Sequence, residues 1–106
     1  MIKEIRHTGI AVYDLKKSLW FYKEKIGFEI FKYVNESGNF IDKILGIRNV
    51  MVTTVKMVLK NGQMIEMLDF SSHKRNVLQR SINDIGPTHL AFTVDNVDEI
   101  YNDFFT

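Results

Sequence analysis

The sequence contains no cysteine, which excludes disulfides and thiolate metal ligands. Any bound metal ion must therefore be held by nitrogen and oxygen atoms. No apolar run is long enough to span a membrane, and the first four residues do not begin a signal peptide. We therefore expect a cytoplasmic protein with no membrane partner.

An excess of charge of one sign is also missing. Lysine and arginine total 14 and aspartate and glutamate total 13, so the net charge is +1 with histidine neutral. Such a balance gives no reason to expect nucleic acid or an anionic membrane as a partner. The 106 residues, of which 45% are hydrophobic and 25% charged, suit one small soluble domain.

A strand–helix pattern occurs twice in the chain. The first copy, HTGIAVYDLKKSLWFY, covers His7–Tyr22, and the second, HLAFTVDNVDEIYNDFF, covers His89–Phe105. Each copy predicts a short strand that opens with histidine, a polar cap (Asp14 or Asn96), and an amphipathic helix. A duplicated unit can place two histidines in equivalent positions that face one cavity.

The first predicted strand, residues 5–13, has two unequal faces. One face carries His7, Gly9 and Ala11, whereas the other is bulkier, with Thr8, Ile10 and Val12. We therefore expect a helix to cover the bulky face and the histidine face to border open space. That helix should begin after Asp14 and end at Gly27.

The clearest hairpin is predicted over residues 50–59 and 63–70. Asn61-Gly62 suits the positive φ angles of a type I′ turn. Glu66 shares its face of the second arm with apolar residues, and a carboxylate in such surroundings should be paired or bound to something. The four methionines of this region are more typical of strand packing than of a cofactor site; they are Met51, Met57, Met64 and Met67.

His7, Glu66 and His89 form the candidate metal site. Two imidazoles and one carboxylate suit Zn, Ni, Co, Mn or Fe(II) and leave positions for water or substrate. A lone strand histidine is more often satisfied by backbone hydrogen bonds, but the paired placement favours metal. Glu66 alone would otherwise be interpreted as a solvent-facing strand carboxylate.

These residues resemble the vicinal oxygen chelate superfamily, which includes glyoxalase I, methylmalonyl-CoA epimerase, extradiol dioxygenases and bleomycin and fosfomycin resistance proteins. The motifs that carry the resemblance are HTGIAV with Asp14-Leu15 and Phe21-Tyr22, then QMIEML around Glu66, then GPTHLAFTV around His89. The resemblance implies an α+β fold with a cupped mixed sheet and helices outside. It implies a single domain with a βαβββ module over 1–70, a connector over 71–87, and the start (βα) of a second module over 88–106.

The glyoxalase I and epimerase branches look most similar, because Glu66 fills the second ligand position. Their chemistry implies a divalent metal and proton transfer through an enediolate-type intermediate, on a small carbonyl, hemithioacetal or thioester substrate. Glu66 would be both ligand and catalytic residue. The family's fourth ligand would fall near position 148, beyond the 106 residues, so we expect either a homodimer that completes the cup or a piece of a longer protein.

Two other functions stay open. The cup could sequester a small antibiotic-type molecule without catalysis, as bleomycin resistance proteins do. Stacking surfaces for it would come from four aromatic residues, for which core packing is nevertheless the favoured interpretation; they are Trp20, Tyr33, Phe40 and Phe70. The chain could also be a truncated remnant that dimerises.

Overall fold

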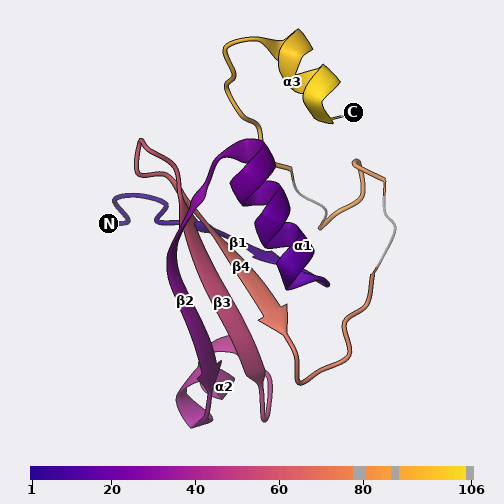
Figure 1. Cartoon of the computed structure of the whole chain (residues 1–106). Coiled ribbons are helices and arrows are strands. Elements are labelled where there is room, and N and C mark those ends of the chain that lie inside the picture. The colour runs from indigo at the N-terminus through magenta and orange to yellow at the C-terminus, as the bar shows by residue number, and fades with distance from the viewer. Residues whose placement is uncertain (78–80, 87–88, 105–106) are drawn as a thin grey trace. The chain divides into compact units, whose positions relative to one another are not determined.

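A computed structural model describes residues 1–77, 81–86 and 89–104 of the chain (Figure 1). The residues divide into two compact units, Met1–Asn76 and Val77–Thr106. Each unit is described by itself below. No helix in the described ranges is long and apolar enough to cross a membrane.

The first unit has the predicted βαβββ order, with a short helix between its second and third strands. Strand β1 is followed by helix α1, which continues as a π-helical segment η1, and then by β2, α2, β3 and β4. The four strands form one mixed sheet in the order β1-β4-β3-β2, with β1 parallel to β4 and the other pairs antiparallel. The predicted α+β class is confirmed. The bounds are Thr8–Ala11 (β1), Leu15–Trp20 (α1), Phe21–Ile26 (η1), Glu29–Ser37 (β2), Asn39–Leu45 (α2), Met51–Val58 (β3) and Met64–Phe70 (β4).

The helical segment formed by α1 and η1 begins and ends where the sequence predicts. The Asp14 carboxylate accepts a hydrogen bond of 3.1 Å from the backbone N–H of Lys17, which satisfies one free donor of the first turn. Gly27 ends η1 with a left-handed φ of 102°, which costs glycine little. Both ends of the helical segment are therefore fixed by local interactions.

Replacing Asp14 with alanine should lower the free energy of unfolding by about 1 kcal/mol, because the capped N–H loses its acceptor. Thermal unfolding followed by circular dichroism would show a fall of roughly 4–8 °C in Tm. Asp14→Ser keeps a capping oxygen and should recover most of this loss. An equal loss in both variants would show that the cap is not the cause.

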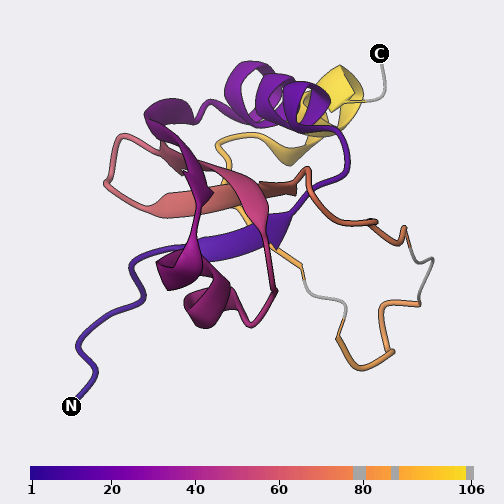
Figure 2. The same cartoon turned by 90° about the horizontal axis from the view of Figure 1, so that it is seen from below.

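The sheet has two faces of different character. The helix face, defined by Tyr33, Val55, Met67 and Asp69, lies under α1, and Figure 2 shows α1 on one side of the strands. Most of the buried core residues are alternate residues of β3 and β4 that project from this face. The fully or nearly buried apolar residues are Phe28, Val50, Val52, Val55, Met57, Ile65 and Met67. Burial also raises the pKa of the Tyr22 hydroxyl above its ordinary value of 10.0.

The opposite face, called here the Glu66 face, carries Gly9, Lys56, Met64, Glu66 and Leu68. Gly9 and Ala11 of β1 are exposed, whereas Thr8 and Ile10 are half-buried. The expectation that a helix covers the bulky side of the first strand, and not its histidine side, agrees with this pattern.

The turn of the β3–β4 hairpin differs from the predicted type I′. The loop has three residues, because Leu59 N–H donates to the Gln63 carbonyl at 2.9 Å and Gly62 N–H donates to the Leu59 carbonyl at 2.9 Å. Gly62 has a φ of 90°, but Asn61 does not have the positive φ that type I′ requires. The Asn61 side chain instead accepts a hydrogen bond from the Gln63 N–H at 3.0 Å, which stabilises the longer loop.

In the second unit the predicted helix is present as α3, Val97–Phe104. The Asn96 side chain accepts a hydrogen bond from the Glu99 N–H at 3.1 Å, as Asp14 does for α1. The strand predicted for the second copy is absent, because residues 89–94 do not form a strand. A strand needs a hydrogen-bonded neighbour, and the described residues of this unit contain no other strand to supply one.

Candidate metal-binding site

Strands β1 and β4 bring together two of the three predicted site residues. Gly9 pairs with Glu66 in the parallel register, so His7, two residues before Gly9, lies on the same face as Glu66. The Nε2 atom of His7 is 3.5 Å from Oε1 of Glu66. The two side chains are 30% and 14% exposed, so the pair is reachable from solvent but sheltered.

The spacing of these two atoms suits ligands of one metal ion better than a hydrogen bond. An N–H···O hydrogen bond has its heavy atoms about 2.7–3.2 Å apart, which is shorter than the 3.5 Å measured here. Two atoms that each lie about 2.1 Å from a tetrahedral ion are roughly 3.4 Å apart. Imidazole nitrogen and carboxylate oxygen are also donors that Zn, Mn, Fe(II), Co and Ni accept. The pair therefore fits half of a divalent metal site.

His89, the third predicted ligand, is an exposed residue of the second unit. Within residues 1–77, 81–86 and 89–104, no three histidine or acidic side chains gather into a group that could hold a metal ion. The three-residue site of His7, Glu66 and His89 therefore stays a prediction. The remaining histidine, His73, lies in the exposed connector with its Nδ1 2.7 Å from Ser72 Oγ, as expected of a loop residue.

Sequence reasoning did not anticipate a second feature of this face, a row of charged residues across the strands. Lys56 of β3 lies directly opposite Glu66, and Lys32 of β2 lies directly opposite Lys56. Opposite residues project from the same face of a sheet. A signal was present in the sequence, because Lys56 and Glu66 are equally distant from Asn61, at the tip of the predicted hairpin.

Comparison with known proteins identifies the family. A model of the Glyoxalase/Bleomycin resistance protein/Dioxygenase superfamily matches residues 4–104. The chain belongs to this superfamily. The match includes β1, the hairpin and the second copy of the repeat, so the resemblance seen in the motifs around His7, Glu66 and His89 is confirmed.

The chain is also similar to individual proteins. The uncharacterized protein YwkD of Bacillus subtilis is 28% identical over 101 residues, which cover 93% of this chain and 67% of YwkD. A glyoxalase family protein from Bacillus cereus has a similar crystal structure, with a TM-score of 0.89, 23% identity, and coverage of 99% of this chain and 72% of that one. The fosfomycin resistance protein FosX from Listeria monocytogenes has a TM-score of 0.63 and 18% identity, covering 99% and 70%. These two structures support the fold.

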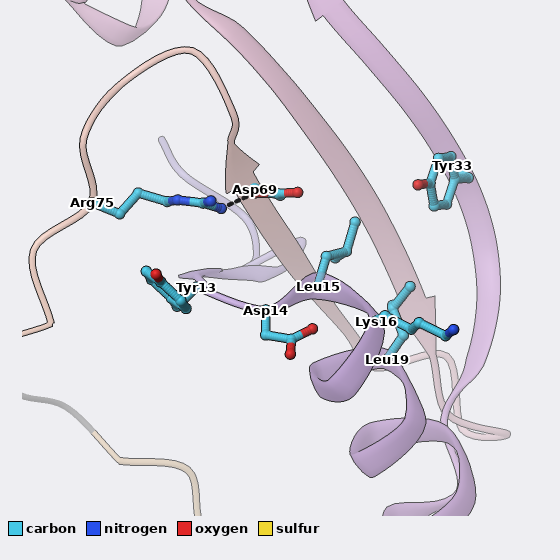
Figure 3. A pocket seen from close by; sticks show the side chains of 8 residues that line it. All are labelled: Tyr13, Asp14, Leu15, Lys16, Leu19, Tyr33, Asp69 and Arg75. Carbon is cyan, nitrogen blue, oxygen red and sulfur yellow. Dashed lines mark hydrogen bonds and ion pairs between the residues drawn. The ribbon is translucent and has the colours of Figure 1, made fainter.

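The first unit of this glyoxalase-superfamily chain also has a pocket of ≈ 580 Å³ on the helix face (Figure 3). Its carboxylates are already engaged: Asp14 caps α1, and Asp69 forms an ion pair with Arg75. The Arg75 guanidinium also lies 5.1 Å from the centre of the Tyr13 ring. The pocket lies on the face of the sheet opposite the His7–Glu66 pair. Its lining residues are Tyr13, Asp14, Leu15, Lys16, Leu19, Tyr33, Asp69 and Arg75.

The aromatic residues considered for ligand stacking are placed differently from the favoured expectation of core packing. Trp20, Tyr33 and Phe40 are 54%, 55% and 79% exposed, so core packing is wrong for these three. Phe70 is half-buried on β4. The core of the first unit is filled by methionine, valine and isoleucine residues together with Phe28, and the rings of Trp20, Tyr33 and Phe40 stay accessible.

Proposed function

We propose that the Glu66 face binds a divalent metal ion through His7 and Glu66, with His89 as the third ligand, and that the chain belongs to the isomerase or epimerase type of the superfamily. The observation that carries the proposal is the His7–Glu66 pair, with 3.5 Å between Nε2 and Oε1. Membership of the superfamily supports it. When bound, a divalent ion polarises a carbonyl oxygen and stabilises the negative charge that develops on it.

The residues of the chain would then have separate roles in binding the ion, accepting the proton and excluding water. His7 Nε2 and Glu66 Oε1 would hold the ion, and Glu66 Oε2 would accept a proton from the carbon next to the substrate carbonyl. The half-buried Met64 and Leu68, on either side of Glu66 along β4, limit the access of water to the carboxylate. The substrate class is a small carbonyl compound, a hemithioacetal or an acyl thioester.

A homodimer is part of this proposal. Among the described strands, β1 is an edge whose only sheet neighbour is β4, and it carries one side of the site. Unpaired strand edges favour pairing with another chain. A second copy placed along this edge would extend the sheet beside His7 and could supply further ligands.

Metal stoichiometry tests the proposal. After incubation with Zn²⁺ or Mn²⁺ and removal of excess ion, elemental analysis should find about one ion per chain in the wild type and markedly less in His89→Ala. Sedimentation of the same samples gives the mass and hence the number of chains per particle. The proton-transfer step is checked in D₂O, where a loaded protein should catalyse deuterium uptake next to the carbonyl of a methylglyoxal–thiol hemithioacetal. The absence of metal from the wild type would overturn the proposal.

A second function, small-molecule binding without catalysis, is favoured by the exposed rings of Trp20, Tyr33 and Phe40 and by the helix-face pocket that Tyr33 lines. The two functions differ in their need for metal. A ligand that raises the Tm equally with and without chelator supports binding alone. A shift that disappears in chelator supports the metal-dependent function.

A further inference from the structure

The charged residues on the Glu66 face occupy one row across three of the four strands of the first unit, β4, β3 and β2. From one edge to the other, Gly9, Glu66, Lys56 and Lys32 lie opposite one another on β1, β4, β3 and β2. Neighbouring strands are about 4.8 Å apart. The backbone of Lys56 therefore lies about 5 Å from that of Glu66, the candidate metal ligand, and the backbone of Lys32 lies about 10 Å from it.

The two lysines are an unfavourable pair unless something negative lies between or above them. Like charges directly opposite each other destabilise a sheet, and Lys32 faces Lys56 in this way. Lys32 is exposed, but Lys56 is half-buried on the central strand β3. In the described part of the chain the side chain of neither lysine has an ion-pair or hydrogen-bond partner.

Glu66 does not neutralise this row. The carboxylate is 3.5 Å from His7 Nε2, and in the proposed function it would be the counter-ion of the metal bound there. With Glu66 engaged in that way, the ammonium group of Lys56 is left without compensation a short distance from the place where the substrate carbonyl would lie. A half-buried cation beside a ligand site attracts an anionic group.

We propose that the Glu66 face recognises a small molecule with a carboxylate or phosphoryl group, held by Lys56 and assisted by Lys32. This inference rests on the proposed function for the position of the reacting carbonyl, and it narrows the substrate class to anionic carbonyl compounds. Because Lys56 is the strand neighbour of Glu66, the anionic group lies only a few bonds from the carbonyl. Lys32, one strand further, accommodates a larger or doubly charged group.

The test uses the full chain with chelator present, so that no metal takes part. Pyruvate and inorganic phosphate are titrated separately into ¹⁵N-labelled protein, and amide shifts are followed. At least one anion should bind with a Kd in the millimolar range and shift residues of β3 and β4, and the affinity should fall as salt rises. Lys56→Met should weaken binding about tenfold or more, the loss expected for one charge-assisted hydrogen bond.

Lys60→Met is the matched control, because Lys60 is an exposed residue in the loop of the same hairpin. Its affinity for the anion should stay within about twofold of the wild type, since an exposed charge away from the face contributes little. Binding of pyruvate assigns a carboxylate substrate, and binding of phosphate alone assigns a phosphoryl substrate. Failure of both anions to bind at 50 mM, or equal losses in Lys56→Met and Lys60→Met, would overturn the inference.

Failure of the inference and failure of the proposed function are distinguishable. Metal affinity is measured on Lys56→Met, and anion affinity is measured on Glu66→Gln. If the wild type binds the anion but no metal, and Lys56→Met does not bind the anion, the anion site exists and the metal-dependent function is wrong. If metal binds and neither anion does, the metal site stands and the substrate is uncharged.

Discussion

Replacing Glu66 with glutamine should lower the affinity for Zn²⁺ or Mn²⁺ by more than about 100-fold, because groups that only support a metal ligand are already worth 10–100-fold. The substitution keeps the shape of the side chain and removes the charge that faces His7 at 3.5 Å. Isothermal titration of metal into the chelator-stripped protein measures the change. Deuterium exchange in the hemithioacetal should stop as well, because the variant lacks both a ligand and the proton acceptor.

Glu36→Gln is the control for this variant. Glu36 of β2 pairs with Val52 of β3, so it lies on the Glu66 face. Strand β2 is at the opposite edge of the sheet from β1, so Glu36 is far from His7. It changes the net charge by the same amount as Glu66→Gln, and its metal affinity should therefore stay close to that of the wild type. If Glu66→Gln binds metal as well as the wild type does, the contact between His7 and Glu66 is a structural ion pair and the metal site is wrong.

The first unit was predictable because its signals are local. Asp14 and Gly27 bracket a helix through interactions within one or two turns, and the alternation around Glu66 fixes which strand residues share a face. The parallel pairing of β1 with β4 was not deducible from periodicity, because it joins segments more than 50 residues apart. The resemblance to the superfamily implied a mixed sheet but did not specify this pairing.

The predictions that were wrong or incomplete also failed because they depended on interactions beyond the local sequence pattern. Asn61-Gly62 permits a two-residue turn, but the side chain of Asn61 hydrogen bonds to Gln63 and a three-residue loop forms. The pattern of residues 89–94 alternates like a strand, yet a pattern of side chains does not supply hydrogen-bonding neighbours. Lys56 was overlooked because its importance depends on the register with Glu66, not on its own sequence surroundings.

The methionines offer the strongest test of how the sheet is packed. Met67 is fully buried on the helix face of β4. Met67→Ala should lower the free energy of unfolding by about 3 kcal/mol, because lost burial and a residual cavity typically cost 2–5 kcal/mol together. For a domain of this size the Tm should fall by roughly 12–24 °C. Unfolding is followed in chelator, so that metal does not contribute, by circular dichroism and by the fluorescence of Trp20, the only tryptophan.

Met51→Ala is the matched control, since it removes the same atoms from the same sheet. Met51 begins β3 and is 58% exposed, so its loss should change the stability by no more than about 0.5 kcal/mol. The difference between the two variants then measures burial on the helix face alone. Similar small losses in both would mean that α1 does not close over Met67.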